Sequence, residues 1–258
     1  MNVKAVLFDL GETLLHFGPV DRAALFYQGA RQSHEYLRGQ GLRLPEFPTY
    51  IKSQWRALRW ASVKSVLSLR EIDVLGICAR MTQRIGLKLE RAQLQEAMWA
   101  WYEPLARQAR VESVLHQTLS WFKDNNIQMA LVSNTFVPAA TMDRHLVQLD
   151  LLDYFPTRVY SSEVTVRKPH PRIFRTALKQ LNLSPSEVMF VGDRLRMDIC
   201  GAKWSGMRTV WKRTRRGRFG QLFMPDFIID SIDQLPAIVG RLTRTSSHAD
   251  RAVEKQSS

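Results

Sequence analysis

The sequence predicts an α/β fold, a doubly wound Rossmann-like core with a mainly parallel sheet and an inserted helical cap. Short continuous apolar runs, each followed by polar residues, recur along the chain. Stretches with apolar residues at helical spacing separate these runs. Strands that alternate with helices indicate a parallel sheet, whose strands are buried on both faces and therefore read as unbroken apolar runs. One long stretch, about 19–108, shows helical spacing alone.

Each expected strand is a run of this kind. Asp9 and a glycine follow the first run, Ser133-Asn134 follows the second, and Gly192-Asp193 follows a later one. Shorter candidates occur near the C-terminus, and the run 158–160 is the weakest of the set. The expected strands cover residues 5–8, 127–132, 158–160, 188–191, 208–211 and 227–229.

Helices are expected between these strands and in the stretch 19–108. Apolar residues recur at intervals of three and four, which is the period of an amphipathic helix. Within the long stretch, Ser68 and Glu71 have the spacing of a capping box ahead of Ile72. The expected helices cover residues 20–37, 51–58, 72–79, 94–101, 114–122, 142–149 and 173–181.

These elements divide the chain into a core, a cap and a tail. The core is expected to comprise residues 1–16 and 107–241, and the helical cap residues 17–106. The polar segment 242–258 lacks apolar periodicity and is expected to be a disordered tail. A helical block inserted after the first strand of an α/β core is typical of a cap or lid.

Composition narrows the class of protein. The 258 residues carry 37 Lys+Arg and 24 Asp+Glu, a net charge of +13, which favours anionic partners. Two cysteines exclude a disulfide framework, and no apolar stretch reaches the about 20 residues of a membrane span. We therefore expect a cytoplasmic protein without membrane contact. The sequence leaves its oligomeric state open.

Four motifs at strand ends carry the expected chemistry. They are Asp9-Leu10-Gly11-Glu12-Thr13, Ser133-Asn134, Lys168-Pro169, and Gly192-Asp193 followed by Asp198. Open α/β sheets bind ligands beyond the carboxyl ends of their strands, so these side chains are expected to meet there. Three carboxylates in one place repel one another unless a cation is present, and Mg²⁺ prefers oxygen ligands.

In these motifs the sequence resembles the haloacid dehalogenase superfamily, in particular its phosphatase-like members with a helical (C1-type) cap. The similarity extends from about Val3 to Val239. The resemblance implies that Asp9 is the nucleophile and forms an aspartyl-phosphate, and that Lys168 holds both nucleophile and phosphate. The remaining implied roles are phosphoryl binding by Ser133 and by the amide of Asn134, and Mg²⁺ binding by Asp9, Asp193, Asp198 and the carbonyl of Gly11.

One position departs from the family pattern. Family phosphatases usually carry a second Asp two residues after the nucleophile, where it protonates the leaving group, and this chain has Gly11. We interpret Glu12 as a solvated turn residue rather than a substitute acid. Three outcomes stay open: substrates such as acyl phosphates that need little protonation, a slow phosphatase, or a binding protein without turnover.

The function expected from the sequence is a Mg²⁺-dependent phosphatase that acts on a small phosphorylated metabolite. Superfamily dehalogenases lack the acidic fourth motif, so carbon–halogen hydrolysis is not expected. The alternative is a catalytically weak or inactive member that binds an anionic ligand or nucleic acid, since residues 208–218 are densely basic. No nucleic-acid-binding motif accompanies that run, and we interpret it as a solvated loop.

Three further features have structural interpretations. The tryptophans of the cap are expected to form its core, as helical spacing suggests. His16 is expected to pack at the hinge between core and cap, and Cys200 to be a small buried apolar residue. The tryptophans expected in the core of the cap are Trp55, Trp60, Trp99 and Trp101.

Overall fold

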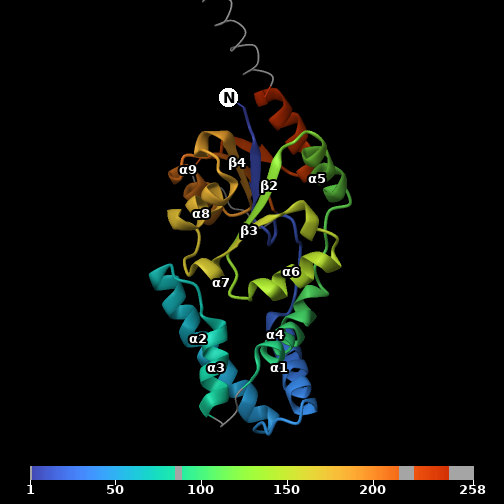
Figure 1. Ribbon diagram of the computed structural model, residues 1–258, viewed down its shortest axis with the longest axis vertical. Helices are drawn as coiled ribbons and strands as arrows, with labels where there is room; N and C mark the ends of the chain where they lie inside the picture. The colour runs from blue at the N-terminus through green and yellow to red at the C-terminus, as the bar shows by residue number, and fades with distance from the viewer. Residues whose placement is uncertain (1, 85–88, 215–223, 244–258) are drawn as a thin grey trace, which may run out of the picture.

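A parallel sheet forms the centre of the fold (Figure 1). The computed structural model describes residues 2–84, 89–214 and 224–243. In these ranges the strands lie in the order β3-β2-β1-β4-β5-β6, and every neighbouring pair is parallel. The predicted α/β class is confirmed. The strands are β1 (Ala5–Phe8), β2 (Gln128–Ser133), β3 (Thr157–Tyr160), β4 (Val188–Gly192), β5 (Arg208–Lys212) and β6 (Phe227–Ile229).

Helices cover both faces of this sheet, which explains the unbroken apolar runs of its strands. In β1, Val6 and Phe8 belong to one buried cluster, and Ala5 and Leu7 belong to the cluster on the opposite face. The first cluster includes residues of α5 and α6, and the second includes residues of α8. The elements around the sheet are α5 (Leu115–Asp124), α6 (Ala139–Gln148), η1 (Leu152–Tyr154), α7 (Ser161–Val164), α8 (Pro171–Leu181), η2 (Pro185–Glu187), η3 (Leu195–Cys200), α9 (Gly201–Trp204) and η4 (Ile232–Gln234).

The other four helices form a separate layer, here called the helical insertion. They are α1 (Arg22–Gly39), α2 (Phe47–Ser68), α3 (Val74–Arg84) and α4 (Arg91–Ala106), and they lie between β1 and α5 in the chain. Figure 1 shows them beyond the end of the sheet to which β1 runs. Gly29 permits α1 and α4 to approach closely, because a Cβ there would lie 2.1 Å from the carbonyl oxygen of Trp101.

Two chain segments connect the helical insertion to the sheet, and they pair with each other. The amide of His16 donates to the carbonyl of Arg110 at 2.8 Å, and the amide of Arg110 donates to the carbonyl of His16 at 2.8 Å. These bonds form an antiparallel bridge. His16 therefore packs between the connections, as predicted. Across the described ranges, no helix combines the length and apolar character that a membrane crossing would require.

The predicted capping box at Ser68 and Glu71 is wrong. Ser68 is the last residue of α2, and α3 begins only at Val74. The carboxylate of Glu71 accepts hydrogen bonds from the amide of Ile72 and from the hydroxyl of Ser161. Ser161 lies far from Glu71 in the sequence, so local residue spacing cannot indicate this contact.

The aromatic core predicted for the helical insertion is correct only in part. Trp99 is 5% exposed, whereas Trp55 is 47% and Trp60 is 78% exposed. The interpretation as core is therefore wrong for Trp55 and Trp60. Cys200 is buried, as predicted. Of the expected tail 242–258, residues 242 and 243 still belong to a helical segment, and residues 244–258 lie outside the described residues, as do the basic residues of the segment 215–218.

Candidate active site

The topology of the sheet brings the predicted site residues to one edge. Asp9 follows β1, Ser133 ends β2 and Asp193 follows β4. In the sheet, β1 lies between β2 and β4, with Phe8 paired to residues of both strands. All three strands are parallel, so their carboxyl ends point the same way. The three side chains therefore emerge next to one another, beyond the sheet and toward the helical insertion.

A buried lysine joins two of the carboxylates. Lys168 Nζ lies 2.5 Å from Asp9 Oδ1 and 2.6 Å from Asp198 Oδ1, and its side chain is 2% exposed. Burial favours the neutral amine, but the carboxylates of Asp198 and Asp9 outweigh burial and raise the pKa of Lys168. The lysine is therefore a fixed cation in direct contact with Asp9.

Both carboxylate oxygens of Asp9 are held. Lys168 occupies Oδ1, and the hydroxyl of Thr13 donates to Oδ2 at 3.3 Å. The backbone amide of Asp9 donates to the carbonyl of Val191 in β4 at 2.9 Å. Thr13 belongs to the first motif, but the sequence alone predicts no role for its hydroxyl. The only indication in the sequence is that this hydroxyl lies four residues after the expected nucleophile.

Asp9, Asp193 and Asp198 form an acidic cluster that suits a hard cation. Each offers one carboxylate oxygen, and these oxygens lie within 4.8 Å of one another. Burial first, and then the charges of Asp9 and Asp198, raise the pKa of Asp193 to about 7. Oδ1 of Asp193 is buried and has no hydrogen-bond partner among the described residues. An oxygen-ligated ion such as Mg²⁺ would supply the missing partner.

The end of β4 is shaped to bring Asp198 into this cluster. A Cβ on Gly192 would lie 2.5 Å from Cβ of Asp198, so only glycine permits the close approach. Asp198 lies in the π-helical turn η3, and its Oδ2 accepts from the amide of Arg194 at 2.9 Å. π-Helical turns of this kind are often found at functional sites. Burial raises the pKa of Asp198 to about 6, against the opposing effect of Lys168.

Asn134 links the second and third motifs. Its side-chain amide donates to the carbonyl of Lys168 at 3.1 Å, and its carbonyl oxygen accepts from the amide of Lys168 at 2.8 Å. The neighbouring Ser133 is buried. The sequence suggested a role for the backbone amide of Asn134, and its side chain has this additional one. The pair of hydrogen bonds fixes the lysine loop beside the end of β2.

Gly11 occupies the position where family phosphatases usually carry the second Asp, and there is room for a side chain at this position. A Cβ built on Gly11 meets no atom within 4 Å, and its backbone is outside the positive-φ region. Glu12 follows with φ of 61°, and its carboxylate lies 3.8 Å from Nδ1 of His16. The Glu12 side chain is therefore directed toward the connection to the helical insertion.

The basic segment near the end of β5 is not simply a solvated loop. Lys212 is 2% exposed, donates to the carbonyl of Thr13 at 2.7 Å, and forms an ion pair with Glu112. Nε2 of His16 lies 3.0 Å from Nζ of Lys212. Burial opposes ionisation of Glu112, but hydrogen bonds from His16 and Lys212 outweigh it and lower the pKa of Glu112 to about 2. The predicted solvated loop is therefore wrong for Lys212.

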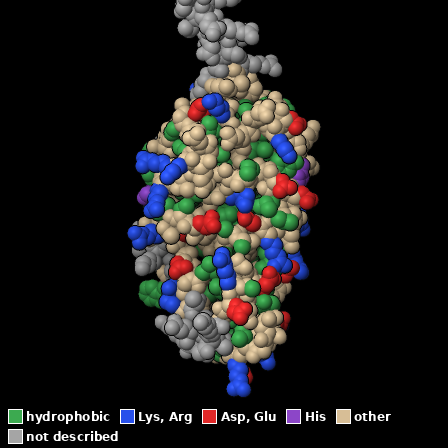
Figure 2. Space-filling model, viewed as in Figure 1, with side chains coloured by type: hydrophobic (Ala, Val, Ile, Leu, Met, Phe, Trp, Pro, Cys, Tyr) green, Lys and Arg blue, Asp and Glu red, His purple; other side chains and the backbone are tan. Residues whose placement is uncertain are grey.

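The surface charges also bear on the basic run. Arg213, the next residue after β5, forms an exposed ion pair with Asp230. On the face shown in Figure 2, Lys and Arg side chains are interspersed with Asp and Glu side chains. The excess positive charge of the chain is thus not gathered on this face.

The helical insertion reaches the site through Glu71. Its side chain is 2% exposed and accepts a hydrogen bond from the hydroxyl of Ser161. That hydroxyl oxygen also accepts from the amide of Thr135 at 2.8 Å, one residue beyond Asn134. Nε of Arg167 lies 3.5 Å from Glu71 Oε2. Glu71 therefore contacts the loop that carries Lys168 directly through Arg167, and it is connected to the loop after β2 through Ser161.

Comparison with known proteins agrees with this geometry. The family model of haloacid dehalogenase-like hydrolases matches residues 3–206. The chain is 28% identical to the glyceraldehyde 3-phosphate phosphatase of Methanopyrus kandleri over 250 residues, covering 94% of this chain and 99% of that protein. The phosphatase of the same name from Pyrococcus furiosus is 40% identical over 101 residues, which are 37% of this chain and 41% of that one.

A solved structure extends the similarity to the whole fold. The crystal structure of a HAD phosphatase from Thermococcus onnurineus is 26% identical, with a TM-score of 0.60, and the match covers 92% of this chain and 98% of that one. The family match covers all four motifs, and the described side chains of those motifs meet at one edge of the sheet. The chain therefore belongs to the haloacid dehalogenase-like hydrolase family.

Proposed function

We propose that this chain is a Mg²⁺-dependent phosphatase that hydrolyses a small phosphate monoester through an aspartyl-phosphate on Asp9. The observation that carries the proposal is the contact of Asp9 with buried Lys168, beside the carboxylates of Asp193 and Asp198. A relative that spans nearly the whole chain is named a phosphatase, which supports the same reaction class.

The proposed reaction has two displacements at phosphorus. In the first, a carboxylate oxygen of Asp9 forms a bond to phosphorus while the bond from phosphorus to the ester oxygen breaks, and the leaving oxygen takes a proton from solvent. In the second, a water oxygen attacks the phosphorus, the bond to Asp9 breaks, and inorganic phosphate leaves. Asp9 returns to its starting state.

The other residues position the phosphoryl group and balance its charge. Lys168 provides a cation beside Asp9, and Ser133 with the amide of Asn134 would donate hydrogen bonds to phosphoryl oxygens. Asp9, Asp193, Asp198 and the carbonyl of Gly11 would hold Mg²⁺, which supplies positive charge for the phosphoryl oxygens. Removal of any of these charges should raise the barrier, because phosphoryl transfer depends on electrostatic stabilisation.

The source of the leaving-group proton sets the preferred substrates. Gly11 offers no acid, and the Glu12 carboxylate is directed toward His16. Esters with a weakly basic leaving oxygen need little protonation as the bond breaks. We therefore infer a preference for acyl and aryl phosphates over simple alkyl phosphates.

The helical insertion, within residues 17–106, acts as the cap in this proposal. Its two connections pair at His16 and Arg110, and it contacts the site through Glu71. A cap that closes over the acidic cluster would exclude bulk water, and electrostatic interactions would be stronger there.

Phosphate release from phenyl phosphate tests the proposal. We expect turnover with Mg²⁺, loss of turnover on chelation, and a phosphoryl adduct on Asp9 detectable by mass spectrometry after acid quench. Salt-sensitive retention of nucleic acid without any turnover would instead support a binding protein with this fold.

A further inference from the structure

The helical insertion contains a large apolar pocket that the proposed chemistry does not use. Its volume is about 550 Å³, within the range of small-molecule sites. All four helices of the insertion contribute to its wall. Representative lining residues are Leu37 of α1, Tyr50 and Gln54 of α2, Ile77 of α3, and Met98 and Trp101 of α4.

The lining is apolar and almost free of charge. Among the described residues that line it, Arg56 is the only one with a charged side chain, and none has a carboxylate. One polar atom stands out: Oε1 of Gln54 is buried and accepts no hydrogen bond from the described residues. A buried carbonyl oxygen without a donor is unfavourable, and a ligand that carries a donor would relieve this cost. The pocket therefore suits an apolar group with one hydrogen-bond donor.

One end of the pocket is formed by the sheet-containing part of the chain. Of the lining residues that the structure describes, only Phe136 lies outside the insertion, and it follows Ser133 by three residues. Three residues of extended chain span at most about 11 Å, so Phe136 lies close to the expected phosphoryl-binding loop. Phe136 also packs with Ile72 and Val74 in one apolar cluster.

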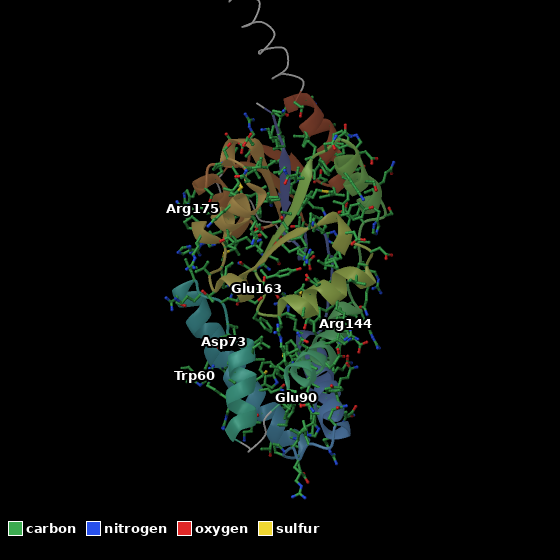
Figure 3. All side chains as sticks on the ribbon, viewed as in Figure 1. Trp60, Asp73, Glu90, Arg144, Glu163 and Arg175 are labelled. Atoms are coloured by element: carbon green, nitrogen blue, oxygen red, sulfur yellow. The ribbon has the colours of Figure 1, made fainter. Side chains whose placement is uncertain are left out.

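Two hydrogen bonds also connect the segment between α2 and α3 to the part of the chain around Lys168. The amide of Arg167 donates to the carbonyl of Leu69 at 2.9 Å, and Glu71 contacts Ser161. Residues 69–73 connect α2 to α3, and both helices contribute residues to the lining of the pocket. In Figure 3, the labelled Trp60 of α2 and Asp73, just before α3, lie below Glu163 of α7.

We propose that this pocket receives the alcohol portion of the substrate, and that the substrate is a phosphate monoester of an elongated apolar alcohol. This inference rests on the proposed phosphatase activity. The phosphate would be held at Asp9 and Lys168, and the apolar portion would pass Phe136 into the insertion. The unpartnered Oε1 of Gln54 predicts a further preference for a chain that bears a hydroxyl or amide N–H.

Phenyl phosphates with para-alkyl chains of increasing length test the substrate class. Their leaving oxygens have similar basicity, so changes in kcat/KM report binding of the chain rather than proton transfer. We expect kcat/KM to rise by about three- to fourfold for each methylene that is buried. Ala57→Phe fills the pocket and should abolish this gain while phenyl phosphate is hydrolysed as before. Ala23→Phe, at an exposed position of α1, is the matched control and should retain the gain.

The outcomes separate the pocket from the chemistry. Turnover of phenyl phosphate with no dependence on chain length would overturn the pocket proposal and leave the phosphatase proposal standing. If no ester is hydrolysed, the phosphatase proposal fails, and binding of octylphosphonate by calorimetry still tests the pocket. Octylphosphonate should bind more tightly than methylphosphonate, and Ala57→Phe should remove the difference. Equal binding of the two phosphonates would overturn the pocket proposal. If Ala57→Phe does not fold, Gln54→Leu should strengthen octyl binding without filling the pocket, and unchanged binding would again overturn it.

Discussion

Ser161, at the start of α7, donates its hydroxyl proton to the carboxylate of Glu71 in the helical insertion. The same hydroxyl oxygen accepts from the amide of Thr135, so one side chain connects the insertion to the loop after β2. The backbone amide of Glu71 also donates to the carbonyl of Thr165 at 3.1 Å. The insertion and the predicted phosphate-binding loops are thus joined by hydrogen bonds as well as by the chain connections.

Glu71→Leu and Ser161→Ala should each lower kcat for phenyl phosphate by about ten- to a hundredfold, because each removes a hydrogen bond to a charged group, which contributes about 1.5–3 kcal/mol. Since both variants remove the same contact, the double variant should be no worse than the poorer single one. Ser162→Ala is the matched control, since its hydroxyl has no partner among the described residues. Losses of activity that add in the double variant would show that the two residues act independently.

Asp9→Asn should reduce turnover to background, because an amide is a poor nucleophile while its shape is nearly the same. Lys168 keeps its contact with Asp198, so the variant should stay folded. Phosphate release and thermal unfolding measure the two effects separately. Asp124→Asn, an exposed Asp at the end of α5, is the control and should behave as wild type. Activity of Asp9→Asn within tenfold of wild type would exclude Asp9 as the nucleophile.

The acidic cluster predicts a pH-dependent response to Mg²⁺. The pKa of Asp193 is raised from 3.8 to about 7, so the folded protein retains a proton that the unfolded chain releases. This stabilisation is present at low pH and is lost as the pH rises toward 7. Mg²⁺ binds the ionised cluster, and it should raise Tm more at pH 8 than at pH 5.5.

His145 has the opposite pH dependence and must be separated from this effect. Burial lowers its pKa to about 4, so it reduces stability as the pH falls below about 6.5. The contribution of His145 to Tm is the same with and without Mg²⁺. It therefore does not enter the Mg²⁺-induced change in Tm. Asp193→Asn should diminish that change at pH 8. A change in Tm of the same size in wild type and variant would argue against a metal at Asp193.

The fold and most of the site could be predicted because their signals are local. A strand buried on both faces must be a continuous apolar run, and a parallel sheet places the residue after each run at one edge. Asp9 and Asp193 were therefore recognisable from the strands that they follow. The roles of Glu71 and Lys212 could not be predicted, since their partners lie far away in the chain: Ser161 for the first and Thr13 for the second. Such contacts leave no local spacing to detect.

The size of the pocket in the insertion could not be predicted from the sequence either. Helical spacing indicates which residues face inward, but it does not state how closely four helices approach. Trp60 has the spacing of a core residue, yet its side chain is 78% exposed. The identity of a ligand depends on that distance, which the tertiary structure sets.

The absence of an acid at Gly11 gives the sharpest test of the proposed chemistry. A positioned general acid contributes about 10²–10⁴-fold, and its effect grows with the basicity of the leaving oxygen. The wild-type protein should therefore hydrolyse phenyl phosphate far better than glycerol 3-phosphate. Gly11→Asp should raise kcat/KM for glycerol 3-phosphate more than for phenyl phosphate. The position can accept a side chain, since a Cβ meets nothing within 4 Å and the backbone φ is not positive.

Gly39→Asp, at the exposed end of α1 where a Cβ is also unobstructed, is the matched control and should leave the ratio of the two rates unchanged. Thermal unfolding of both variants separates a loss of folded protein from a change in chemistry. Equal hydrolysis of both esters by wild type would mean that another residue supplies the proton. Glu12→Gln would then identify or exclude the neighbour: a selective loss of glycerol 3-phosphate hydrolysis would assign the proton to Glu12, despite the proximity of its carboxylate to His16.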